Sequence, residues 1–171
     1  MSGSKAFGKS LFNGCSVIVG SICVGIYVIM LTISGSPYEM IHKLDIGKMI
    51  PPMWMWRVFS IVWIFLSGVA AGLVVYERIC HRIAGERELR AYRGGIYFIS
   101  SFFLTIVHYP LFFCLERLMI AFLVALLAMI GAAVSSVIWS KVSAISSVIL
   151  AGNAFWLLYV TFISACLLIG N

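Results

Sequence analysis

Charged residues are scarce in this chain. Asp, Glu, Lys and Arg make up 11% of its 171 residues, whereas hydrophobic residues make up 63%. A soluble domain carries roughly 25% charged residues, because water must solvate its surface. The scarcity of charge argues against a soluble globular domain, and the high hydrophobic content argues against a disordered chain. The remaining class is an integral membrane protein, whose apolar surface is surrounded by lipid.

The sequence also lacks the patterns of metal centres and of catalytic sites. Its five cysteines include no CxxC pair, so we expect neither metal ligation nor a disulfide framework. No nucleophilic triad and no carboxylate pair is visible, so we predict no catalytic residue and rank an enzyme lowest among the function classes. The basic and aromatic pattern of a nucleic-acid-binding protein is missing as well.

Long apolar stretches fill most of the chain. Five of them approach or exceed the roughly 20 residues that a membrane-crossing helix needs. They cover about residues 11–33, 53–76, 94–115, 118–139 and 142–169. We therefore predict an all-α integral membrane protein, in which residues 1–171 form a single domain built as a five-helix transmembrane bundle. The short third and fourth connections predict that the last three spans are antiparallel neighbours.

The distribution of Lys and Arg predicts the orientation of the bundle. With five spans, the N-terminus and the second and fourth connections share one side of the membrane. That side holds eight basic residues: Lys5, Lys9, Arg78, Arg82, Arg87, Arg90, Arg93 and Lys141. The other side holds four: Lys43, Lys48, Arg57 and Arg117. The positive-inside rule places the N-terminus inside and the C-terminus outside. We attribute the net charge of +6 to orientation and lipid headgroup contact.

No Asp, Glu, Lys or Arg lies at the centre of a predicted span. This argues against an ion-coupled pump, which needs a membrane-buried charge. Ser101, Thr105 and His108 recur at helical spacing and therefore share one face. His108 either faces a bound molecule or makes an ordinary interface hydrogen bond, and we favour the second interpretation. For Asn153, a pocket-lining amide and an interhelical hydrogen bond are equally supported.

Four of the five tryptophans lie towards span ends: Trp54, Trp56, Trp63 and Trp139. That position is typical of the aromatic belt at the membrane interface. Trp156 lies in the middle of a span, where a belt role fails. Its indole therefore either packs between helices or lines a pocket.

Gly68 and Gly72 form a GxxxG pattern in the predicted span at 53–76. Small residues at this spacing let two membrane helices approach closely. The pattern is common in membrane sequences. Close packing within the bundle is therefore at least as well supported as a dimer contact.

A series of landmarks resembles the translocator protein family, also known as tryptophan-rich sensory proteins or peripheral benzodiazepine receptors. The landmarks are Pro51-Pro52-Met53-Trp54, Gly68, Tyr109-Pro110-Leu111-Phe112-Phe113, Trp139, Val142-Ser143 and Trp156. Their order and spacing match the family over about residues 15–165. Several family positions differ here: Ser60 and His108 stand where the family has tryptophan, and Gly152-Asn153 stands where it has Pro-Tyr. The C-terminal sterol motif is absent, because no Lys or Arg follows Tyr159.

The resemblance implies a five-helix bundle, commonly a homodimer, with a pocket between the helices and the connection at 34–52 folded over it as a lid. Family members bind porphyrins and related tetrapyrroles, and some bind cholesterol or benzodiazepine-like drugs. Some bacterial members promote light-dependent porphyrin breakdown with two pocket tryptophans. Of those two, only Trp139 has a direct match here, because Ser60 stands at the other position.

We therefore expect a receptor-like membrane protein that binds a porphyrin or haem-like tetrapyrrole, or a similar apolar molecule, and senses, transports or regulates it. No other cofactor is required. The expected ligand-binding residues are Trp54, Ser60, Trp63, Ser101, Thr105, His108, Trp139, Asn153 and Trp156. Charged propionates of a porphyrin would meet Lys43, Lys48 or Arg57 at the pocket mouth. The alternative is a transporter for a small apolar solute, which the absence of a repeated half argues against. The expected location is the cell membrane of a bacterium or the outer mitochondrial membrane of a eukaryote.

Overall fold

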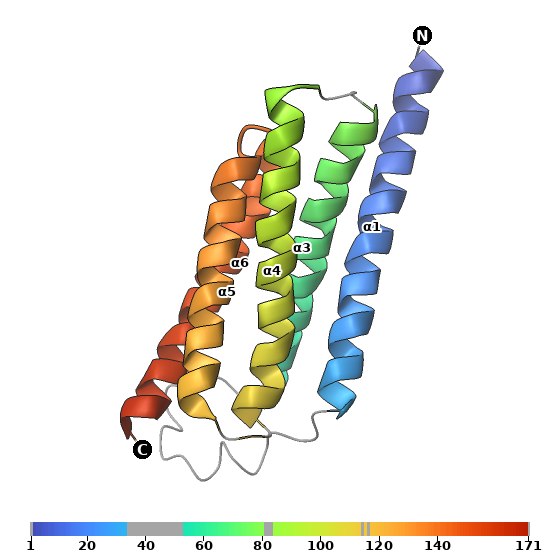
Figure 1. Cartoon of the computed structure of the whole chain (residues 1–171). Coiled ribbons are helices and arrows are strands. Elements are labelled where there is room, and N and C mark those ends of the chain that lie inside the picture. The colour runs from blue at the N-terminus through green and yellow to red at the C-terminus, as the bar shows by residue number, and fades with distance from the viewer. Residues whose placement is uncertain (1, 34–52, 81–83, 114, 116, 171) are drawn as a thin grey trace.

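Five α-helices account for almost all of the chain that the structure describes. The structure is a computed structural model and describes residues 2–33, 53–80, 84–113, 115 and 117–170. The helices are α1 (Ser2–Ile33), α3 (Met53–Cys80), α4 (Glu86–Phe113), α5 (Leu118–Trp139) and α6 (Ala144–Gly170). They run side by side as one bundle, with the two chain ends at opposite ends of it (Figure 1). The predicted all-α membrane bundle is confirmed.

Four helices are long and apolar enough to cross a membrane: Trp54–Ile79, Glu86–Phe112, Leu118–Trp139 and Ala144–Ile169. In α1 the apolar stretch among the described side chains is shorter, Ser16–Thr32. Figure 1 nevertheless shows α1 running along the length of the bundle. The predicted lid at 34–52 lies outside the described residues, and so do Lys43 and Lys48.

Helix α4 begins about two turns earlier than the apolar pattern predicts, at Glu86 instead of about residue 94. Gly85 precedes it with φ 68°, a left-handed conformation that glycine adopts without steric cost. Glu86 and Glu88 lie in the first turn, where carboxylates interact favourably with the helix dipole. Glu86 also pairs with Arg90 one turn later. The charged segment that precedes residue 94 is therefore a helical extension beyond the apolar region.

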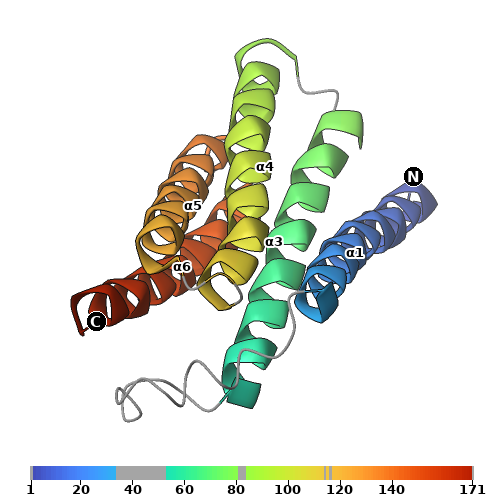
Figure 2. The same cartoon turned by 60° about the horizontal axis from the view of Figure 1, so that its bottom comes forward.

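Helix α1 packs against α3 through small residues. A Cβ added to Gly68 would lie 2.7 Å from the Cα of Gly20, and one added to Gly72 would lie 2.7 Å from the Cα of Ser16. The GxxxG pattern therefore brings α1 and α3 together within one chain. Figure 2 shows α1 on the outer flank of α3, away from α5 and α6.

Helices α4, α5 and α6 pack consecutively, as the short connections predict. Helix α5 turns a row of small buried residues towards its neighbours: Ala121, Ala125, Ala128, Ala132 and Ser135. Helix α3 then packs on α6, whereas it touches α4 only lightly. Side chains from α3, α4, α5 and α6 consequently converge on a space in the interior of the bundle.

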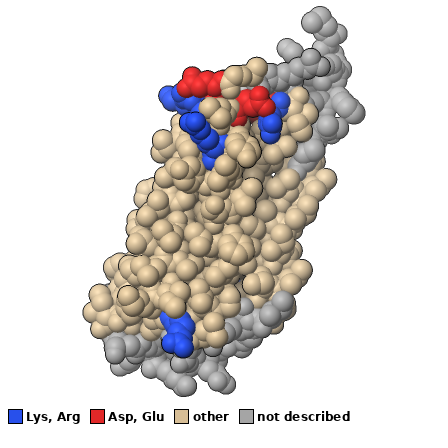
Figure 3. All heavy atoms as spheres, in the orientation of Figure 1, with Lys and Arg blue, Asp and Glu red and all other residues tan. Residues whose placement is uncertain are grey.

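Charge gathers at one end of the molecule. Figure 3 shows basic and acidic atoms together at the end where α4 begins, above a broad uncharged band. Arg78 pairs with Glu88 at 2.9 Å, and Arg87 donates to the carbonyl of Val142 at 3.2 Å. This is the end that the positive-inside rule assigns to the inside of the membrane. The orientation itself stays a prediction.

Candidate ligand-binding site

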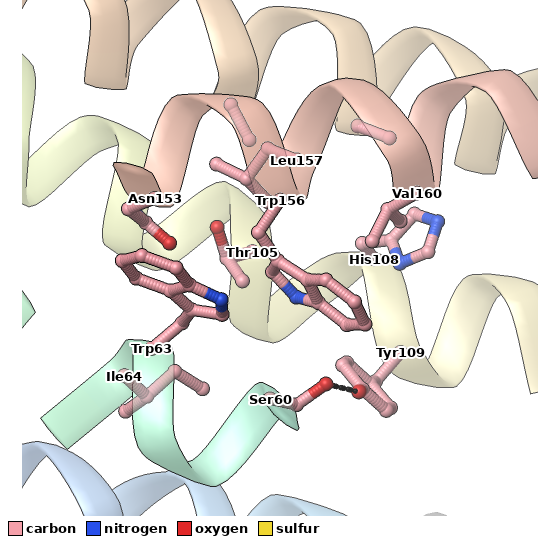
Figure 4. Close-up of a pocket in the computed structure, with 12 residues that line it drawn as sticks. Ser60, Trp63, Ile64, Thr105, His108, Tyr109, Asn153, Trp156, Leu157 and Val160 are labelled. Carbon is pink, nitrogen blue, oxygen red and sulfur yellow. Dashed lines mark hydrogen bonds between the residues drawn. The ribbon is translucent and has the colours of Figure 1, made fainter. Parts of the chain in front are cut away.

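A cavity lies inside the bundle between α3, α4, α5 and α6 (Figure 4). About 20 Å³ of it is open to the centres of water molecules, which leaves room for about one water. Most of the lining is apolar or aromatic, and a few polar groups converge on it. The lining residues are Ser60, Trp63, Ile64, Thr105, His108, Tyr109, Ala125, Ala128, Asn153, Trp156, Leu157 and Val160.

The indoles of Trp63 and Trp156 occupy much of the space between these helices (Figure 4). Trp63 lies against Gly152, where an added Cβ would come within 2.7 Å of the ring atom Cζ3. Trp156 stacks on Phe59 with ring centroids 5.7 Å apart. Neither indole N–H donates a hydrogen bond to any residue in the described part of the chain. Packing alone therefore holds these two rings in place.

Two other tryptophans are anchored by hydrogen bonds. Trp56 Nε1 donates to the hydroxyl of Tyr109 at 3.1 Å, and Trp139 Nε1 donates to the carbonyl of Ala91 at 3.2 Å. A buried indole N–H usually finds such a partner. The contrast separates two tryptophans held by hydrogen bonds from the two at the cavity, whose rings are held by packing alone.

The polar groups of the lining differ in how well they are satisfied. Thr105 donates to the carbonyl of Ser101 one turn earlier at 2.8 Å. His108 Nε2 lies 3.4 Å from the hydroxyl of Ser164, and its ring stacks on Phe112. The amide of Asn153 makes no hydrogen bond to any described residue. Asn153 therefore offers both a donor and an acceptor to a molecule in the cavity.

A cluster of hydroxyl groups borders the cavity on the side of α1. The oxygens of Ser60 and Tyr109 are 2.6 Å apart, and Trp56 donates to the same phenol. The ring of Tyr27 from α1 meets that of Tyr109 edge-on at 5.0 Å. The Tyr27 hydroxyl is buried close to both groups, but it forms no hydrogen bond of good geometry with a described residue. We refer to Tyr27, Trp56, Ser60 and Tyr109 as the hydroxyl cluster.

A second, smaller cavity adjoins the first, with about 10 Å³ open to water centres. The two share Ile64, Thr105 and Asn153 as lining residues. Ser101 lines the second cavity and donates to the carbonyl of Ala128 at 2.6 Å. The Thr105 and Asn153 side chains therefore stand between two small spaces rather than at the end of one.

The structure brings together six of the nine residues expected from the sequence. Those at the first cavity are Ser60, Trp63, Thr105, His108, Asn153 and Trp156. Ser101 is at the second cavity. Trp54 is 65% exposed on the outside of α3. Trp139 is buried elsewhere, stacked on Phe98 at 5.5 Å, with Gly94 leaving room for its ring.

Sequence reasoning missed several residues of the site. Tyr109 adjoins His108 and begins the landmark at residues 109–113, which is a signal for its phenol. Ala125 and Ala128 carry a weaker signal, because two small residues three apart let another helix or a ligand approach. Tyr27 carries no such signal, since it lies on α1, far along the chain from its neighbours. Arg57, expected at the pocket mouth, has an exposed side chain.

Among the described residues, no group of three or more His, Cys, Asp or Glu side chains is placed to hold a metal ion. The cavity offers aromatic faces, one free amide and hydroxyl groups. This set of groups suits the reversible binding of an apolar molecule with a few polar atoms.

The comparisons with known proteins agree with the fold. Comparison with curated protein sequences gave no significant match. The model of the TspO/MBR family matches residues 16–169, nearly the whole chain and all the helices that surround the cavity. The chain, an integral multi-pass membrane protein, therefore belongs to the TspO/MBR family.

Proposed function

We propose that this protein is a membrane receptor for a flat apolar molecule of the tetrapyrrole class, bound in the first cavity. The observation that carries the proposal is the pair of unanchored indoles, Trp63 and Trp156, beside the free amide of Asn153. Aromatic faces suit a conjugated macrocycle, and a few polar groups orient it. Family membership supports the same general role.

Binding requires the cavity to widen, because the present space holds about one water molecule. Rotation of the Trp63 or Trp156 side chain would open it without breaking a hydrogen bond between described residues. The rotated indole would then lie at the wall of the widened cavity, where it can stack on the face or edge of the bound ring.

Light-dependent breakdown of the ligand is not part of the proposal. The two positions that the family uses for it correspond here to Ser60 and Trp139. Ser60 has no indole, and Trp139 is fixed among α4 residues outside the lining of the first cavity. The two positions therefore do not supply a pair of indoles at the cavity.

Titration with protoporphyrin in detergent tests the proposal. We expect saturable quenching of the protein's tryptophan fluorescence, and about tenfold weaker binding for Trp156→Leu, equivalent to about 1.4 kcal/mol. Trp54→Phe is the matched control, because Trp54 lies on the exposed surface of α3. Uptake that rises linearly and equally in protein-free micelles would disprove the proposal.

Passage of the same porphyrin across a liposome bilayer tests whether the protein transports its ligand. In liposomes, a receptor should retain porphyrin stoichiometrically without accelerating its passage across the bilayer. Faster passage, abolished by the Trp156→Leu substitution, would instead support the alternative of a transporter for an apolar solute.

A further inference from the structure

Aromatic rings fill the contact between α3 and α6 beside the first cavity. We call this contact, formed by Phe59 and Trp63 of α3 and by Gly152 and Trp156 of α6, the α3–α6 seam. Figure 4 shows the two indoles between the two helices. The indole of Trp156 lines the cavity and also stacks on Phe59, with ring centroids 5.7 Å apart and ring planes 21° apart.

Phe59 is the outer member of this stack. It does not line the cavity, and it is 44% exposed on the outside of α3. Phe155 and Leu158 of α6 are exposed as well. Trp156 lies about 18 Å along α6 from Ala144, at 1.5 Å per residue, so the stack is near the middle of a membrane-crossing helix. A molecule dissolved in the hydrocarbon of the bilayer therefore meets the Phe59 ring without passing through water.

Packing alone closes the α3–α6 seam beside the cavity. Among the described residues, those of α3 and α6 that line the cavity make no hydrogen bond to one another. The two helices are hydrogen-bonded farther along, nearer the charged end, where the Ser146 hydroxyl donates to the carbonyl of Ala70 at 2.9 Å. The seam can therefore open beside the cavity while this bond still joins the helices.

The other contacts around the cavity are held differently. The hydroxyl cluster joins α3 to α4, where the oxygens of Ser60 and Tyr109 are 2.6 Å apart. Ser101 joins α4 to α5 by donating to the carbonyl of Ala128 at 2.6 Å. Helices α5 and α6 pack on each other as extensively as α4 and α5 do. Separation of α3 from α4, or of α4 from α5, would break a buried hydrogen bond, whereas opening of the α3–α6 seam beside the cavity would not.

We propose that the ligand enters the first cavity from within the bilayer through the α3–α6 seam, and that Phe59 and Trp156 form the gate that closes it. The inference rests on the proposed function and deepens it, because it restricts the ligand to molecules that dissolve in a membrane. Rotation of the Trp156 indole away from Phe59 joins the cavity to the lipid. Phe59 lies outside the lining, so it controls the rates of entry and exit and not the equilibrium affinity.

Stopped-flow quenching of tryptophan fluorescence by protoporphyrin in detergent micelles tests the gate. We expect Phe59→Ala to raise the association and dissociation rate constants each by about fivefold, within the range of one lost aromatic pair, and to leave Kd within about twofold. All five tryptophans remain in this variant, so the signal is comparable with that of the wild type. Phe59→Leu, which keeps an apolar side chain without a ring, should act in the same direction if the alanine variant does not fold.

Phe103→Ala is the matched control. Phe103 is 63% exposed on α4 and does not line either cavity, so both of its rate constants should stay at the wild-type values. Equal acceleration in Phe103→Ala and Phe59→Ala would mean that loss of any exposed ring loosens the bundle, and it would overturn the inference.

Two other results would also overturn it. Unchanged rate constants in Phe59→Ala and Phe59→Leu, with normal affinity, would show that the ligand enters elsewhere and would leave the proposed function intact. A weaker affinity with an unchanged association rate would make Phe59 part of the binding site and not of a gate. Failure of the wild-type protein to bind protoporphyrin would instead disprove the proposed function, and this inference with it.

Discussion

At the scale of single residues, the site depends on where glycine makes room for an indole. Gly152 lies under the six-membered ring of Trp63, and Gly94 leaves the space that the pyrrole edge of Trp139 fills. Each pair joins two helices, and each glycine interrupts a helix surface that another residue would cover. The ring of Trp139 is also held by a hydrogen bond, whereas that of Trp63 is not.

Replacing Gly152 should displace the Trp63 ring. We expect Gly152→Ala to lower the free energy of unfolding by about 1–3 kcal/mol, the usual cost of overpacking, and to shift the tryptophan emission spectrum. The measurement is unfolding in mixed detergent followed by fluorescence. Gly25→Ala is the control, because no atom lies within 4 Å of an added Cβ there. Unchanged emission in Gly152→Ala would contradict the observed contact.

At the scale of the elements, the attachment of α1 to the bundle depends mainly on one contact surface. It packs extensively only on α3, where Gly68 and Gly72 face Gly20 and Ser16. Membrane helices gain little from the hydrophobic effect, so close packing of small residues carries much of their association. Helix α1 is therefore the element most easily detached from the bundle.

Substitution of either glycine should separate α1 from α3. We expect Gly68→Leu or Gly72→Leu to abolish disulfide cross-linking between cysteines introduced on facing turns of α1 and α3. Gly95→Leu on α4 is the control, because an added Cβ at Gly95, unlike one at Gly68 or Gly72, meets no atom within 4 Å. Conversion of a dimer to a monomer with the cross-link intact would show that the glycines serve a dimer instead.

The apolar pattern predicts where helices lie but not which way they face. Helix α5 is apolar around most of its circumference, so hydropathy does not mark its inner side or show that Trp139 lies outside the lining of the cavity. The family landmarks indicated Ser60 by position, whereas helical spacing indicated His108 and a mid-span position indicated Trp156. Contacts between distant helices, such as Tyr27 with Tyr109, depend on three-dimensional packing that one sequence does not reveal.

At the scale of the whole molecule, the charged end gives the bundle a direction. Ser140, in the connection between α5 and α6, lies at the end that holds Arg78 and Arg87, whereas Arg117 precedes α5 at the opposite end. The positive-inside rule predicts that the first end faces the inside of the membrane.

Labelling with a membrane-impermeant thiol reagent tests this orientation. In a variant whose five natural cysteines are replaced, Ser140→Cys should react only after the membrane is opened, and Arg117→Cys should react in intact cells or organelles. Both positions are exposed, so a difference in reactivity reports the side of the membrane. The reverse pattern would show that the bundle is inserted the other way.

The order of contacts has a consequence for biosynthesis. Helices α1 and α3 leave the ribosome first and pair with each other, whereas α4, α5 and α6 follow and pair in turn. Asn153 and Trp156 are on α6, which is made after the other four described helices, so the cavity does not exist until α6 docks on α3. A nascent chain therefore has no binding site before α6 is in place, and a truncated chain that lacks α6 has no site to fill.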